Sequence, residues 1–89
     1  RKILIIVPSN LRKQWSAELQ EKFFLPSIIL ETKSFNERIK TGNLNPFIQE
    51  NTIILCSYHF TRSKAAYIKP IKWDLVVIDE AHRLRNVYK

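Results

Sequence analysis

Glycine, cysteine and methionine are nearly missing from this 89-residue chain. It contains no methionine, one glycine, Gly42, and one cysteine, Cys56, which lies in the apolar run "TIILCS". The single glycine excludes a phosphate-cradling G-x-x-x-x-G-K-[ST] loop, the Walker A loop, within these residues. The single cysteine excludes an intrachain disulfide and favours a reducing compartment. In its apolar surroundings it is not expected to act as a nucleophile.

Acidic residues and long hydrophobic runs are also scarce. The first apolar run, "ILIIV", is too short for a membrane span or a signal-peptide core, so no membrane partner is expected. Lys and Arg number 15 against 8 Asp and Glu, a net charge of +7, and residues 1–17 and 51–73 contain bases but no acid. This imbalance favours polyanionic partners, nucleic acid first, although a basic surface without a partner explains the charge equally well.

What the chain does contain is a set of short, continuous apolar runs, which predict an α/β fold. Hydrophobic residues make up 45%, and the length allows one domain at most. The runs are rich in β-branched residues and mostly do not alternate with polar ones, as in strands buried on both faces of a parallel sheet. They span residues 3–7, 27–30, 52–56 and 74–78.

The segments between these runs predict helices, so that strands and helices alternate as in βαβ units. "SNLRKQWSAELQEKF" carries one apolar stripe with a four-residue repeat, and Ser9 or Asn10 can cap its start. The stripe consists of Leu11, Trp15, Leu19 and Phe23. Its spacing places Trp15 in the core rather than in a base-stacking role. Further short helices are expected at "SFNERIK", capped by Ser34, and over residues 58–67.

Polar residues follow three of the predicted strands, at the edge where parallel sheets bind their ligands. They are Pro8-Ser9-Asn10, Ser57-Tyr58 and Asp79-Glu80. Asp79, at the end of a buried strand, can hold Mg²⁺, and Glu80 can orient and deprotonate an attacking water. Phosphoryl transfer needs mainly such positioning and electrostatics, so the pair indicates ATP hydrolysis. The alternative is a strand that ends in a solvated acidic turn.

Three motifs resemble, in the same order, those of one family. "DEAHRLRN" resembles motif II of the Snf2-type branch of superfamily 2 helicase-like ATPases, with Arg85 where lysine is more usual. "LIIVPSNLRKQWSAEL" resembles motif Ia, a strand ending in proline and then a helix with Trp15 and Glu18. "ILCSYHF" resembles the family's Thr-Ser-Tyr motif, with Cys56 in place of threonine. The resemblance spans nearly the whole chain.

The resemblance implies a partial RecA-like sandwich of the P-loop NTPase type, with flanking helices and a mostly parallel sheet of about four strands. Residues 1–89 would be an interior part of the N-terminal RecA-like helicase ATP-binding lobe, lacking the Walker A loop and the second lobe. Such a slice is expected to be inactive alone and to bind ATP negligibly. Its uncovered sheet edges and apolar faces are expected to favour self-association.

The family's roles carry over to the matching positions. Glu80 would be the catalytic base and Asp79 would serve Mg²⁺, so that both would contribute to the ATP site. His82 would couple the nucleotide site to motifs that sense DNA, as a switchable donor near the phosphates. The residues that would meet the phosphate backbone of nucleic acid are Ser9, Asn10 and Ser57. Plain helix capping is the alternative for each, and a capped helix N-terminus can also bind phosphate.

The function implied by the resemblance is that of a DNA-dependent ATPase and translocase that uses ATP and Mg²⁺ to move along double-stranded DNA. One alternative is a DEAH-type helicase that separates RNA or DNA strands, and another is a non-catalytic basic nucleic-acid-binding module. The nearest relatives are expected among bacterial Snf2-like helicases. Restriction or phage-defence subunits are therefore candidate partners, and the bacterial cytoplasm is the expected location.

Overall fold

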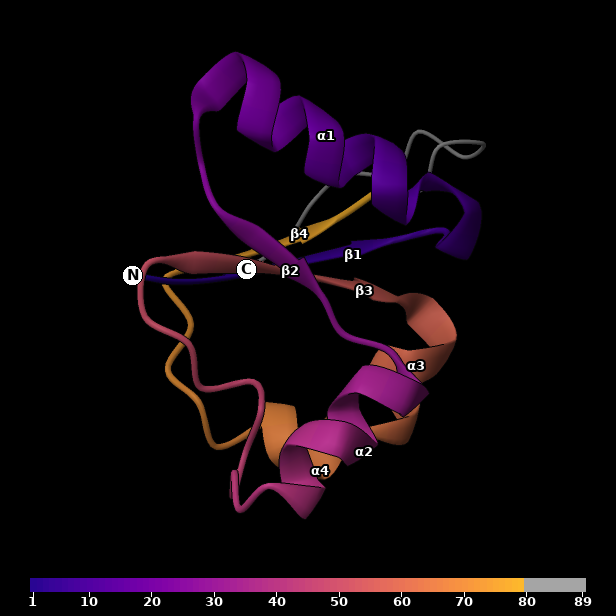
Figure 1. The fold of residues 1–89 in the computed structure, drawn as a ribbon, viewed down its shortest axis with the longest axis vertical. Coiled ribbons are helices and arrows are strands. Elements are labelled where there is room, and N and C mark those ends of the chain that lie inside the picture. Colours follow the sequence, from indigo (N-terminus) through magenta and orange to yellow (C-terminus); the bar gives the residue numbers. More distant parts are fainter. Residues whose placement is uncertain (80–89) are drawn as a thin grey trace.

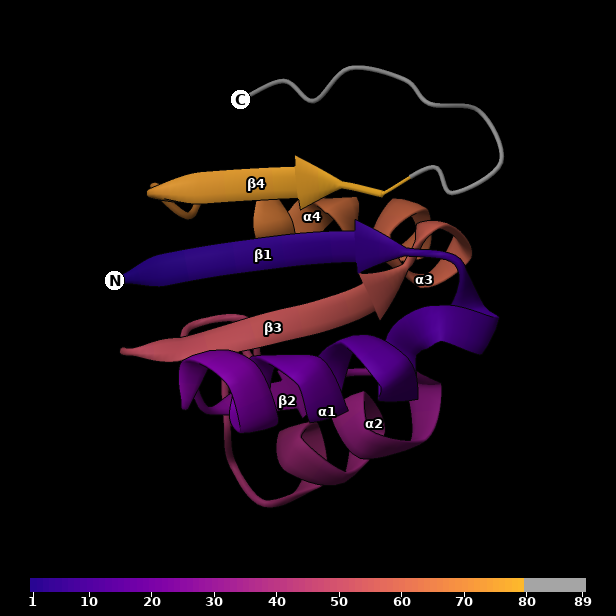
Figure 2. The same ribbon diagram turned by 90° about the horizontal axis from the view of Figure 1, so that it is seen from above.

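The chain forms a parallel sheet with helices on both faces. The computed structural model describes residues 1–79. Within that range the sheet has four strands in the order β2-β3-β1-β4, and all neighbouring strands run parallel (Figures 1 and 2). The strands are β1 (Lys2–Val7), β2 (Ser27–Ile29), β3 (Thr52–Ser57) and β4 (Leu75–Ile78). The predicted α/β class, with a parallel sheet of about four strands as in part of a RecA-like fold, is confirmed.

The register of the central strands aligns their carboxyl ends. β1 pairs with β3 from Lys2 opposite Thr52 to Val7 opposite Ser57, and with β4 up to Ile6 opposite Ile78. β1 and β3 are buried through most of their length, which explains why their sequences are continuous apolar runs. Residues that follow β1, β3 and β4 therefore meet at one edge of the sheet, where the arrows of Figure 2 point.

One face of the sheet is covered by α1 (Arg12–Phe23), which follows a 3₁₀ turn, η1 (Ser9–Leu11) (Figure 1). Leu19 is buried against the sheet and Trp15 packs beside it, as the predicted stripe requires. The stripe does not extend to Phe23, which is 63% exposed. The helix ends there because Phe24 takes a left-handed conformation, and its N–H bonds back to the Gln20 carbonyl.

The other face is covered by α2 (Thr32–Lys40), α3 (Tyr58–Ser63) and α4 (Ala65–Ile68) (Figure 1). Two predictions are corrected here. Glu31, not Ser34, is the N-cap of α2, and Ser34 is its partner three residues on in a capping box. The single helix expected over residues 58–67 is two short helices, because Lys64 departs from helical geometry between them.

Aromatic side chains fill the core between these helices and the sheet. Phe35 lies at the centre, with its ring centroid 5.9 Å from that of Phe47, 5.8 Å from Phe60 and 4.9 Å from Tyr67. Phe47 comes from the turn-rich stretch after α2, so this irregular segment is anchored to the core rather than loosely attached. The scaffold under the carboxyl edge is thus packed on both faces.

Candidate functional site

Asp79 directly follows β4, at the edge where the polar residues gather. Its backbone N–H donates to the Ile6 carbonyl at 2.7 Å and so extends the pairing of β4 with β1. Its own carbonyl accepts a hydrogen bond from the Tyr58 hydroxyl, which comes from the start of α3. Two elements therefore hold the Asp79 backbone in place.

The Asp79 side chain is half-buried and is oriented by a third element. Its Oδ2 accepts a hydrogen bond from the Trp15 indole Nε1 of α1 at 2.8 Å. Trp15 packs against the cluster between α1 and the sheet, so its predicted core position is confirmed, but its polar edge reaches the site. Sequence reasoning missed this contact. The signal available was that a partly buried indole N–H usually finds an acceptor.

Asp79 is the described residue for which the sequence predicts a metal role. Residues 1–79 bring together no group of three His, Cys, Asp or Glu side chains. A Mg²⁺ ion at Asp79 would therefore take its other ligands from water, phosphate oxygens or residues beyond this range, as Mg²⁺ commonly does. Glu80 and His82 lie outside the described residues, so their predicted roles stay predictions.

The three predicted nucleic-acid residues lie around two adjoining hollows at the same edge. The larger hollow measures about 680 Å³ and contains Ser9 and Ser57 in its lining, while the smaller one measures about 260 Å³ and contains Ser9 and Asn10. The remaining lining of the larger hollow is Arg12, Glu31, Thr32, Lys33, His59, Phe60 and Ser63. That of the smaller is Arg12, Lys13, Ile29 and Glu31. Tertiary structure thus brings Ser9 and Ser57, which lie 48 positions apart in sequence, into the lining of one hollow.

The capping alternative holds for one of these three residues only. Ser57 is the N-cap of α3, and its hydroxyl accepts the Phe60 N–H at 3.2 Å. Ser9 and Asn10 do not cap α1: its N-cap is Leu11, which makes no side-chain cap bond. Both side chains are exposed, because the 3₁₀ turn places them ahead of the helix at the rim of the hollows.

Arg12 and Glu31 form an ion pair in the lining of both hollows. Arg12 Nη1 lies 2.9 Å from Glu31 Oε1, and its Nε donates to the Ser9 carbonyl at 3.1 Å. The other charged side chains in these linings are Lys13 and Lys33, and Glu31 is the one acid among the described lining residues. The edge is therefore suited to anions, and the Glu31 carboxylate competes with a bound anion for Arg12.

Cys56, directly beneath Ser57, is not part of this chemistry. Burial raises the pKa of its thiol to about 12. The neutral thiol prevails at physiological pH, which agrees with the expectation that Cys56 is not a nucleophile.

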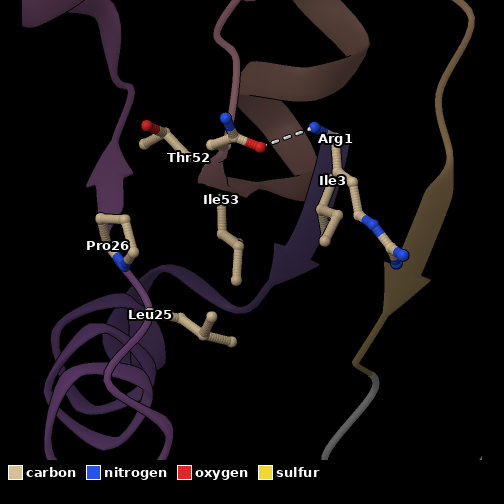
Figure 3. A pocket seen from close by; sticks show the side chains of 7 residues that line it. Arg1, Ile3, Leu25, Pro26, Thr52 and Ile53 are labelled. Carbon is tan, nitrogen blue, oxygen red and sulfur yellow. Dashed lines mark hydrogen bonds between the residues drawn. The ribbon is translucent and has the colours of Figure 1, made fainter.

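An apolar pocket lies at the opposite, amino edge of the sheet. It measures about 360 Å³ and is lined mainly by apolar side chains, including Ile3, Leu25 and Ile53 (Figure 3). Ile3 and Ile53 stand near the starts of β1 and β3, whereas the hollows lie beyond the strand ends. This pocket therefore belongs to a different part of the molecule from Asp79. Among the described residues, no helix has the length and apolarity needed to cross a membrane.

The fold and the edge define an α/β domain whose candidate ligand site follows the carboxyl ends of a parallel sheet. The family model of the SNF2-related domain matches residues 1–88, and the chain belongs to this family. The predicted resemblance to Snf2-type ATPases is thereby confirmed. The match covers both Asp79 and the hollows, so the candidate site lies wholly within the shared domain.

Three curated relatives that resemble this chain are bacterial and much longer. The chain is 34% identical over 86 residues to the RNA polymerase-associated protein RapA of Serratia proteamaculans, covering 93% of this chain and 9% of the relative. It is 35% identical over 86 residues to RapA of Proteus mirabilis, again covering 93% of this chain and 9% of the relative. It is 37% identical over 89 residues to the uncharacterized ATP-dependent helicase YqhH of Bacillus subtilis, covering 97% of this chain and 14% of the relative. The chain thus corresponds to a small part of each.

Proposed function

We propose that this chain is part of the first RecA-like lobe of an ATP-hydrolysing motor that moves along double-stranded DNA. The observation that carries the proposal is that Asp79 and the hollows lined by Ser9, Asn10 and Ser57 share one edge of the sheet. A motor needs such an arrangement, because the nucleotide site and the nucleic-acid site must influence one another. Membership of the SNF2-related family and the helicase name of the Bacillus subtilis relative support it.

In the ATP site, Asp79 would hold Mg²⁺, and Glu80 would orient the attacking water and accept its proton. Mg²⁺ held there would supply charge neutralisation at the phosphates, and the two carboxylates would supply positioning rather than covalent chemistry. His82 relays the state of the nucleotide to the motifs that touch DNA. The Walker A loop and the second lobe are supplied by other parts of a longer protein.

On the nucleic-acid side, the exposed Ser9 and Asn10 and the hydroxyl of Ser57 contact the phosphate backbone. Lys13 and Lys33 add positive charge at the hollows, which favours backbone contacts without reading sequence. A site of this kind suits a protein that tracks along DNA of any sequence.

The deciding experiment measures ATP turnover by the intact protein that carries this chain, with no nucleic acid, with duplex DNA and with single-stranded RNA. We expect duplex DNA to stimulate turnover, and Glu80→Gln to reduce it by about a hundredfold or more because the base is lost. Stimulation by RNA alone would reject the duplex-DNA proposal. No turnover under any condition would favour a basic binding module without catalysis.

A second candidate is a helicase that separates strands, and the name of the Bacillus subtilis relative favours it. A strand-displacement assay discriminates between the two candidates. A helicase releases single strands, whereas a translocase moves a bound obstacle along the DNA and leaves the duplex intact. Association with restriction or phage-defence subunits, and location in the bacterial cytoplasm, stay predictions.

A further inference from the structure

The hydrogen bond from Trp15 to Asp79 joins two residues that are 64 positions apart in sequence. Its donor stands in the first turn of α1, and this helix begins where the hollows lie. Its acceptor is the carboxylate at the end of β4. The Trp15 side chain therefore connects Asp79 to the helix that begins at the hollows.

We propose that Trp15 is a positioning residue that holds the Asp79 carboxylate in the orientation that binds Mg²⁺. The indole N–H takes one acceptor site of the carboxylate, on Oδ2, and an ionised carboxylate has further acceptor sites for the ion or for its water shell. This inference rests on the proposed function, because the metal role of Asp79 belongs to it. It adds a residue that touches neither the ion nor the nucleotide.

The packing of Trp15 makes the indole a fixed donor. Its ring lies against the cluster that contains Leu19 and Val7, between α1 and the sheet. Close-packed side chains keep their rotamers, so the N–H points at a defined place. The Asp79 backbone is held independently, through its N–H and its carbonyl. Trp15 therefore affects the orientation of the Asp79 side chain and not the position of its backbone. Residues that contact metal ligands commonly tune a metal site in this way.

The same bond couples α1 to the carboxylate. Because Trp15 belongs to α1 and its N–H is bonded to Asp79, a shift of α1 would displace the carboxylate. If nucleic-acid binding shifts α1, stronger nucleic-acid binding in the presence of Mg²⁺ and nucleotide would be the reciprocal effect.

The test is the Mg²⁺ dependence of nucleotide binding to the intact protein, measured with a fluorescent, non-hydrolysable ATP analogue. Trp15→Phe keeps an aromatic ring, smaller than the indole, but loses the N–H. We expect the Mg²⁺ concentration at half-saturation to rise by about ten- to a hundredfold, while affinity without Mg²⁺ is unchanged. Trp73→Phe is the matched control, since Trp73 Nε1 donates to the Ile68 carbonyl, away from the site. An unchanged Mg²⁺ dependence in Trp15→Phe would overturn the inference.

Asp79→Asn distinguishes a failure of the Trp15 inference from a failure of the proposed metal role of Asp79. If Asp79→Asn raises the Mg²⁺ requirement and Trp15→Phe does not, the inference fails while the metal role of Asp79 stands. If Asp79→Asn has no effect either, the proposed metal role fails and the inference fails with it.

A second measurement needs no folded Trp15 variant. The indole resonance of Trp15 is recorded in the intact protein and in Asp79→Asn, with a ¹⁵N-labelled tryptophan incorporated at position 15 alone. We expect it to shift on addition of Mg²⁺ and nucleotide and to lie elsewhere in Asp79→Asn, because its acceptor has changed. A Trp15 resonance that responds to neither change would contradict the proposal.

Discussion

At the scale of single residues, Asp79 and Cys56 show how burial decides what a polar side chain can do. Asp79 is half-buried and has an indole donor, so its carboxylate is oriented and still accessible. Cys56 is fully buried among apolar side chains, and its thiol stays neutral. Both follow a run of apolar residues, but only the first reaches the edge of the sheet.

The thiol of Cys56 should be unreactive in the folded protein. Its pKa is raised to about 12 mainly by burial, so the thiolate that attacks disulfide reagents is scarce at pH 8. We expect labelling of Cys56 in the intact protein, followed by mass spectrometry, to be slow in buffer and fast in denaturant.

The same shift has a consequence for stability. A raised pKa favours the neutral thiol in the folded state, so the contribution to stability is full below the ordinary thiol pKa and is lost as the pH rises towards 12.

In the labelling experiment, rapid labelling of Cys56 at pH 8 without denaturant would show that Cys56 is exposed. A Cys56→Ala variant provides the blank for its peptide.

At the scale of elements, the carboxyl edge is built where η1 and α1 meet the start of α2. The Arg12–Glu31 ion pair bridges the two, and Glu31 also caps α2. The pair is partly exposed, with Arg12 at 21% and Glu31 at 51%, so its contribution to stability is small. Its larger effect is on the charge that the hollows present to an anion.

Glu31→Gln should therefore strengthen nucleic-acid binding. The substitution removes the acid that competes for Arg12, while a Gln side chain can still accept the capping bond. We expect the affinity of the intact protein for duplex DNA to rise by about two- to fivefold at low salt, an effect typical of a rim charge. Fluorescence anisotropy over a range of salt concentrations measures it.

Arg12→Ala provides the opposite change. If Arg12 contacts a phosphate, the slope of log affinity against log salt should fall by about one unit. Lys40→Ala is the matched control, because Lys40 is an exposed base at the end of α2 and lines neither hollow. An equal loss in both variants would indicate general charge attraction rather than a contact at this edge.

At the scale of the whole molecule, the described residues form one layer of sheet between two layers of helix. The cores on the two faces of the sheet differ in composition. The α2–α4 side contains the aromatic cluster around Phe35, whereas the α1 side contains aliphatic residues and Trp15. Exposed apolar side chains, including Phe23 and Phe24, remain at the end of α1. Self-association of the isolated chain, expected from such surfaces, stays a prediction.

Phe35→Ala should destabilise the domain by about 3–5 kcal/mol, because it leaves a cavity at the centre of the aromatic cluster. Phe35 is only 2% exposed. Hydrogen exchange of the β3 amides in the intact protein reports the free energy of opening that should fall by this amount.

Phe24→Ala is the comparison for that experiment, since Phe24 is 79% exposed. It should change the free energy of opening by less than about 0.5 kcal/mol. Similar losses in the two variants would mean that the cluster around Phe35 is not the core that stabilises the sheet.

Much of this architecture could be predicted because it depends on local spacing. Continuous apolar runs indicated the strands, and the stripe through Leu19 indicated α1. The stripe failed at Phe23, where the left-handed Phe24 ends the helix, and that stop depends on backbone geometry rather than on hydrophobicity. The sequence predicts Ser34 as the N-cap of the second helix because serine is a favoured N-cap residue, whereas the structure assigns the N-cap to Glu31.

The sequence by itself determined the α/β class, the approximate strands and helices, and the family. Apolar runs and motifs are patterns of residues close together in the chain, and the order of the motifs can be read along it. Only the tertiary structure decided the strand order β2-β3-β1-β4, the gathering of Ser9 and Ser57 in one hollow, and the bond from Trp15 to Asp79. The physical reason is that these contacts join distant segments. Their geometry depends on how α1 packs on the sheet and on the register of the strands, which no local pattern specifies.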